Sequence, residues 1–83
     1  AHIYSSASDI FAFAIILREI MTGEKPYTSL EVSDICREVI NGYREPLPSE
    51  KVPPRVKRII KDCWDQNPGK RPLAQIVHES LVD

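Results

Sequence analysis

The sequence predicts an all-α fold of four helices that form one domain over residues 1–83. Three observations lead to this prediction. Apolar residues recur at the i, i+3, i+4 spacing of amphipathic helices in several separate segments. Glycine and proline residues stand between these segments, where helices usually end or begin. No segment shows the alternation of apolar and polar residues that is typical of a half-buried strand.

The first predicted helix begins at Ser8 or Asp9, because both residues are favourable N-caps, and it extends to about Met21. The helix is apolar on nearly every face, which is typical of a helix at the centre of a larger fold. Gly23 suits the left-handed position that ends a helix, and Pro26 cannot continue one. The segment therefore predicts a buried central helix.

The second predicted helix opens near Ser29 and ends at the Asn41-Gly42 pair. Its apolar residues fall on one helix face: Val32, Ile35, Cys36, Val39 and Ile40. Residues 43–53 follow, and their content of proline and charge predicts an extended loop without a core of its own.

The third predicted helix begins at Pro53-Pro54, where Pro54 suits the first helical turn. Its apolar stripe consists of Val56, Ile59, Ile60, Cys63 and Trp64. A tight turn is predicted at residues 67–69, and Pro72 opens the fourth helix. The stripe of the fourth helix consists of Leu73, Ile76, Val77 and Leu81.

The composition limits the possible functions. Hydrophobic residues make up 42% and charged residues 28% of the 83 residues, which is typical of a globular chain and not of a disordered tail. The net charge of −1 provides no basic field that would attract nucleic acid or anionic lipid. The apolar run from Ile10 to Leu17 is too short for a membrane span, and no secretory signal is visible. We therefore expect no nucleic-acid or membrane partner and a cytoplasmic location, although the longer protein could still be a membrane receptor.

Cysteine and methionine usage adds two expectations. Cys36 and Cys63 lie within apolar helical stripes, so we expect buried thiols and not a disulfide, as in a reducing compartment. The single methionine, Met21, lies inside the chain, from which we expect a piece of a longer protein.

Two motifs carry a resemblance to a known family. Residues 8–27 read SDIFAFAIILREIMTGEKPY, and residues 63–72 read CWDQNPGKRP. Together they resemble the C-terminal helical part of the large lobe of a eukaryotic protein kinase domain. The closest likeness is to the tyrosine-kinase and tyrosine-kinase-like branch, in which a Cys-Trp pair precedes a Pro-x-x-Arg-Pro turn. The resemblance implies an incomplete fold that runs from the end of the activation segment through the last helices.

Asp9 is the first candidate site residue. Its position alone predicts an N-cap or first-turn acid that the helix dipole favours. The resemblance implies that its carboxylate accepts backbone N–H bonds from the catalytic loop of the complete kinase. Both interpretations make Asp9 a structural residue and not a catalyst.

Arg71 is the second candidate. From the sequence alone it is a solvated arginine beside a helix start. The resemblance implies an ion pair with the glutamate of an Ala-Pro-Glu motif that closes the activation segment. This motif does not occur in the chain. We therefore expect Arg71 to turn to water, because an unpaired buried charge is costly.

Trp64 is the third candidate, and its helical spacing predicts an aromatic residue in the core or at its edge. The resemblance implies the same packing role beside the turn at residues 68–72. Phe11, Ala14 and Arg18 depart from the family pattern, which more often has tryptophan or tyrosine, glycine and an aromatic residue at these positions.

No catalytic, cofactor-binding or metal-binding residue is predicted in this chain. Phosphoryl transfer in kinases uses a Gly-rich loop, a strand lysine, a His-Arg-Asp loop and an Asp-Phe-Gly motif, and none of them occurs here. His2 and His78 show no metal-ligand spacing with each other or with the cysteines. The resemblance implies Mg-ATP only for the complete domain, which would phosphorylate protein hydroxyls. Its expected partners are the remainder of the kinase domain and a protein substrate.

One alternative remains open at this stage. A small all-α interaction module without kinase activity could use its exposed apolar surface for docking. The basic residues of the third helix do not favour nucleic acid, since they lie opposite its apolar stripe, where a solvated face is expected. These residues are Arg55, Lys57, Arg58 and Lys61.

Overall fold

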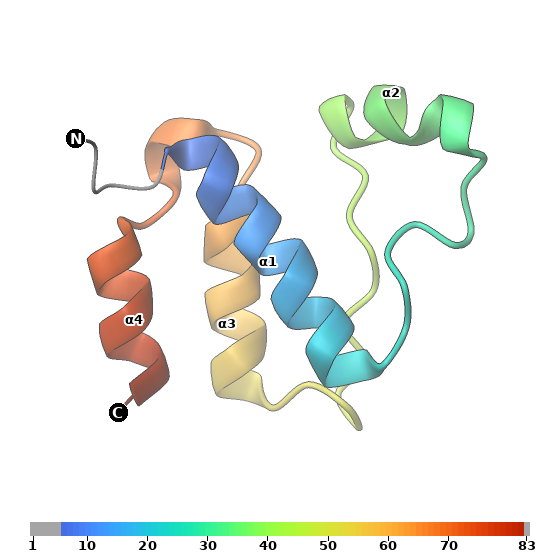
Figure 1. Cartoon of the computed structure of the whole chain (residues 1–83). Helices are drawn as coiled ribbons and strands as arrows, with labels where there is room; N and C mark the ends of the chain where they lie inside the picture. Colours follow the sequence, from blue (N-terminus) through green and yellow to red (C-terminus); the bar gives the residue numbers. More distant parts are fainter. Residues whose placement is uncertain (1–5, 83) are drawn as a thin grey trace.

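A computed structural model describes residues 6–82 of the chain, so His2 lies outside the described residues. Its helices are α1 (Ala7–Thr22), α2 (Ile35–Ile40), α3 (Pro54–Cys63) and α4 (Ala74–Val82), with the short 3₁₀ turns η1 (Val32–Asp34) and η2 (Pro68–Lys70). No strand occurs in this part of the chain. The prediction of an all-α fold with four helices is confirmed. Figure 1 shows α1 crossing α3, α4 beside α3, and α2 apart from the other three.

The core forms where α1 packs on α3. One face of α1 is buried at every fourth residue, through Ile10, Ala14, Arg18 and Thr22. From α3 and its C-cap come Ile59, Ile60, Cys63 and Trp64, and Val52 and Val77 complete the buried apolar cluster. Residues 6–82 cover only one face of α1, and Ile16 and Ile20 on its other side are exposed, so the burial of α1 at the centre of a larger fold stays a prediction.

The N-terminal end of α1 differs from the prediction, whereas its C-terminal end agrees with it. The N-cap is Ser6 and not Ser8 or Asp9, because Ser6 and Asp9 form a capping box. The Asp9 N–H donates to Ser6 Oγ at 3.3 Å, and the Ser6 N–H donates to Asp9 Oδ2 at 3.3 Å. At the other end Gly23 adopts φ +74°, and its N–H donates to the Glu19 carbonyl at 2.7 Å, which confirms the left-handed helix end.

The second helix begins later than predicted. A turn closed by the Leu30 N–H on the Tyr27 carbonyl occupies the expected start near Ser29, and η1 then precedes α2. No residue of η1 or α2 is buried, and Val32 is 85% exposed. Cys36 is therefore exposed, which corrects the expectation of a buried thiol, whereas Cys63 is buried as expected.

The third helix, the loop before it and the last helix can each be compared with their predicted positions. α3 begins at Pro54 as predicted. Residues 43–53 do form a loop, but this loop contributes the buried residues Val52 and Glu45 to the interior, which the prediction missed. α4 starts at Ala74, two residues after Pro72, and only Val77 of its apolar stripe is buried. No helix within residues 6–82 is long and apolar enough to cross a bilayer.

The two cysteines should differ in reactivity with thiol reagents. Burial, with a smaller contribution from the Asp62 carboxylate, raises the pKa of Cys63 to about 11. Because the thiolate is the reactive form, a maleimide at about pH 8 should modify Cys36 in the folded, complete kinase domain and spare Cys63. Peptide mass spectrometry measures both sites. Rapid modification of Cys63 under native conditions would contradict its burial, and denaturation should make it react.

Candidate functional site

Arg71 is half-buried and does not turn to water as the sequence suggested. Its Nε donates to the Asp65 carbonyl at 2.8 Å, and its Nη1 donates to the Ala7 carbonyl at 3.0 Å. The expectation failed because these two backbone carbonyls provide acceptors that a charged guanidinium needs once it leaves water. Arg71 thereby ties the segment after α3 to the first turn of α1.

A second arginine joins Arg71 at the ring of Phe11. The Cζ atoms of Arg44 and Arg71 lie 4.8 Å and 4.9 Å from the centroid of this ring, within the range of cation–π contacts. Arg44 is fixed by its Nε, which donates to the Trp64 carbonyl at 2.8 Å, and by its Nη2, which donates to Gln66 Oε1 at 2.8 Å. Burial lowers the pKa of Arg44, and the positive charge of Arg71 acts in the same direction.

These side chains form one wall of a pocket of about 340 Å³. It lies between the first turns of α1, the end of α2 and the segment after α3, and it is lined by Ser8, Phe11, Val39, Ile40, Arg44, Gln66 and Arg71. No lining residue is acidic, and both of the charged ones are arginines. The chemistry of the pocket therefore suits a carboxylate that is carried next to an apolar side chain.

The structure brings two of the three candidate site residues together. Trp64 is 6% exposed and packs in the core, and its carbonyl holds Arg44 beside Arg71. Asp9 is exposed and lines a different, largely apolar hollow of about 380 Å³ between α1 and α4. The roles that the resemblance implies for Asp9 and Arg71 require groups outside this chain, and they stay predictions.

Sequence reasoning missed Arg44 and Gln66. Both residues lie outside regular helices, so no periodicity marks them. The signal that was present is the Arg44 side chain in a loop that is otherwise rich in proline, but only the folded chain shows that it reaches Trp64.

The residues present do not fit Mg-ATP. Within residues 6–82 no group of three or more His, Cys, Asp or Glu side chains is arranged to hold a metal ion. The glycines Gly23, Gly42 and Gly69 lie at three separate turns, so they form no run of backbone N–H groups around a phosphate.

Comparison with known proteins agrees with this helical architecture and with the paired motifs. Residues 1–81 match the family described as protein tyrosine and serine/threonine kinase, and the chain belongs to this family. It is 38% identical over 79 residues to tyrosine-protein kinase abl-1 of Caenorhabditis elegans, and 35% identical over 79 residues to ephrin type-A receptor 10 of Mus musculus. Each alignment covers 94% of this chain.

A third relative, protein-tyrosine kinase 6 of Mus musculus, is 34% identical over 80 residues, which cover 95% of this chain. The predicted resemblance to the tyrosine-kinase branch is thereby confirmed. The chain spans 6%, 8% and 18% of the lengths of abl-1, the ephrin receptor and kinase 6, respectively.

Proposed function

We propose that residues 1–83 are the C-terminal helical part of a kinase large lobe, from the end of the activation segment through the last helices. The complete kinase would transfer the γ-phosphate of Mg-ATP to a protein hydroxyl, with the remainder of the domain and a protein substrate as partners. This chain contributes a scaffold to that reaction and no catalytic group. We place it inside the cell, in a cytoplasmic kinase or in the cytoplasmic part of a receptor, since its relatives include one protein named as a receptor and another named only as a tyrosine-protein kinase.

The observation that carries the proposal is the pair of arginines at the pocket beside α1. Arg71 uses Nε and Nη1 for backbone carbonyls, and its Nη2 has no acceptor within residues 6–82. Arg44 and Phe11 hold this guanidinium at the pocket wall. We infer that the pocket receives the carboxylate of a glutamate in the preceding activation segment, and that this contact anchors the segment in its working shape.

The anchoring role can be tested by replacing Arg71 in the complete kinase domain. Arg71→Ala should lower the free energy of unfolding by about 1.5–3 kcal/mol, the range for hydrogen bonds to charged groups. It should also lower phosphoryl transfer to a protein substrate at least about ten-fold, which corresponds to 1.4 kcal/mol in the barrier. The measurements are thermal unfolding and steady-state kinase activity.

The neighbouring residue provides the matched control. Lys70 is exposed, and Lys70→Ala should leave both quantities unchanged because it removes a cation without touching the pocket. Full activity and unchanged stability of the Arg71→Ala kinase would contradict the proposed anchor. Phosphoryl transfer by the purified 83-residue chain alone would contradict its role as a scaffold.

A further inference from the structure

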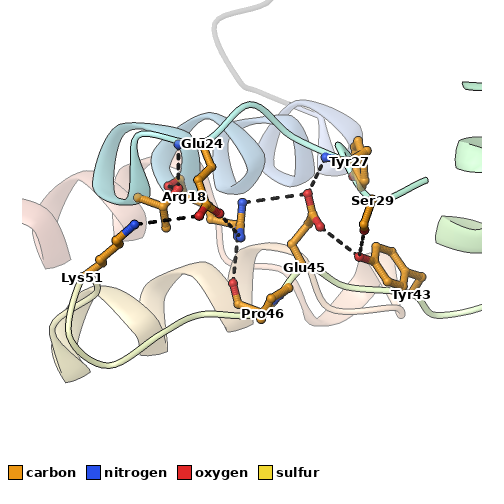
Figure 2. A network of polar contacts seen from close by, with 9 residues as sticks. Arg18, Glu24, Tyr27, Ser29, Tyr43, Glu45, Pro46 and Lys51 are labelled. Carbon is orange, nitrogen blue, oxygen red and sulfur yellow. Dashed lines mark hydrogen bonds and ion pairs between the residues drawn. The ribbon is translucent and has the colours of Figure 1, made fainter. Parts of the chain in front are cut away.

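A second polar cluster lies at the C-terminal end of α1, and Glu45 is at its centre (Figure 2). Its Oε1 accepts the backbone N–H of Tyr27, and its Oε2 accepts the hydroxyl of Tyr43 at 2.9 Å. The Nη1 of Arg18 lies 3.8 Å from Oε1. The hydroxyls of Ser29 and Tyr43 lie 3.2 Å apart. We refer to Arg18, Tyr27, Tyr43 and Glu45 as the Glu45 latch.

The charges of the latch are buried and matched. Arg18 is 4% exposed and Glu45 is 7% exposed, so neither charge is solvated by bulk water. Arg18 also donates through Nε to the Pro46 carbonyl at 2.9 Å and through Nη2 to Glu24 Oε1 at 3.2 Å. Within residues 6–82 no buried side-chain nitrogen or oxygen lacks a hydrogen-bond partner. A fully satisfied network of this kind favours one local geometry over others.

The backbone at Tyr27 depends on this network. Tyr27 has φ +60°, a left-handed conformation that residues other than glycine rarely adopt. Its N–H points to the Glu45 carboxylate, so the latch offers this strained turn a charge-assisted hydrogen bond. Without the carboxylate, the Tyr27 N–H would lose this hydrogen bond, and the backbone after Gly23 would be free to leave the left-handed conformation.

The latch joins the two segments that lead into and out of α2. Tyr27 and Ser29 precede η1 and α2, whereas Tyr43 and Glu45 follow them. Neither η1 nor α2 has a buried residue, so little apolar packing fixes them against the other helices. Figure 1 shows α2 at the end of these two segments, away from α1 and α3.

A second set of polar contacts holds the C-terminal end of α2. We refer to residues 24–42, which contain η1 and α2, as the α2 arm. Arg44 Nη1 donates to the Val39 carbonyl at 3.2 Å, and Gln66 Nε2 donates to the Ile40 carbonyl. The position of α2 therefore depends on polar contacts at two places, at the base of its connections and at its C-terminal end.

We propose that the Glu45 latch is a conformational device that sets the position of α2. When it is closed, Glu45 pins both flanking segments to α1. When it opens, residues 24–42 become more mobile about the remaining contacts at Val39 and Ile40, while the packing of α1 on α3 is retained. This proposal does not depend on whether the complete protein is an active kinase.

The test distinguishes greater mobility of the α2 arm, residues 24–42, from a loss of stability of the whole domain. In the complete kinase domain, Arg18→Met combined with Glu45→Leu removes both buried charges at once, and such replacements are often neutral for stability. The melting temperature should change by less than about 4 °C, while amide hydrogen exchange over residues 24–42 rises at least about ten-fold. Exchange in α3 should stay unchanged. Glu45→Leu alone should lower the melting temperature more than the double variant, because it leaves Arg18 charged and buried.

Lys51→Ala is the matched control. Lys51 lies 3.8 Å from Glu24 at the exposed rim of the same network, and its removal should alter neither the melting temperature nor exchange over residues 24–42. A nitroxide on the exposed thiol of Cys36, with other accessible thiols replaced, gives a second reading of the mobility of α2. Unchanged exchange and an unchanged spectrum in the double variant would overturn the proposal. An equal rise of exchange in α3 would also overturn it, since the pair would then only stabilise the whole fold.

Discussion

Replacing Ile60 with alanine in the complete domain should lower the free energy of unfolding by about 2–5 kcal/mol. Ile60 is fully buried at the centre of α3, within the cluster that faces α1. The loss combines the transfer free energy of the removed methyl and methylene groups with the cost of a cavity. Ala14 and Cys63 of the same cluster are small and lie on helices, so the cluster has little capacity to collapse around the gap. Urea unfolding of the purified domain measures the change.

Lys61→Ala is the control on the same helix, since Lys61 is exposed and the change should shift stability by less than about 0.5 kcal/mol. A small and equal effect of both substitutions would show that α3 does not direct this face to α1.

The parts of the fold that follow periodicity or local backbone chemistry could be predicted from the sequence. Pro54 opens α3 because its missing N–H has no partner to lose at a helix start. Gly23 ends α1 because its φ of +74° has no steric cost for glycine. Four of the five residues in the stripe of α3 are buried as their spacing indicates, where α1 packs against α3, and Val56 is half-buried.

Other features depend on contacts between distant segments and could not be predicted. Val52 and Glu45 lie in a loop without periodicity, and only the fold shows that this loop runs beneath the end of α1. The buried Arg18 follows the apolar residues Ile10 and Ala14 on the same face of α1, which the sequence displays but does not explain. Its partner Glu45 is 27 residues further along the chain, so local rules cannot pair them.

The candidate site also combines features that local sequence patterns predict with features that only the folded chain shows. The motif that contains Arg71 is recognisable in the sequence, and so is the position of Phe11 in the first helix. The prediction that Arg71 faces water treated it as a lone charge, and it overlooked the Ala7 and Asp65 carbonyls that come within reach on folding. A backbone carbonyl oxygen has two lone pairs and can accept a hydrogen bond from arginine, but no sequence pattern states which carbonyl does so.

The isolated 83-residue chain should be poorly ordered, and the complete domain should restore its order. Large apolar side chains on α1, α2 and α4 and in the turns before α2 and α4 remain exposed within residues 6–82, among them Ile16, Ile20, Val32, Ile40, Leu73 and Ile76. A core in so short a chain rarely supplies more than about 3–5 kcal/mol, and uncovered apolar surface favours association over the folded monomer. Hydrophobic-dye binding, a weak near-ultraviolet circular dichroism signal and concentration-dependent association are the expected observations.

The same measurements on the complete domain provide the comparison. There the surfaces around α1 and α4 should be covered by the remainder of the large lobe, because the apolar hollow between them, lined by Ile10, Phe13 and Val77, needs an apolar neighbour to exclude water. Dye binding should then disappear, and these helices should unfold cooperatively with the rest of the domain. A monomer of the isolated chain with a sharp thermal transition that does not depend on concentration would favour a self-sufficient interaction module over a scaffold that requires its kinase.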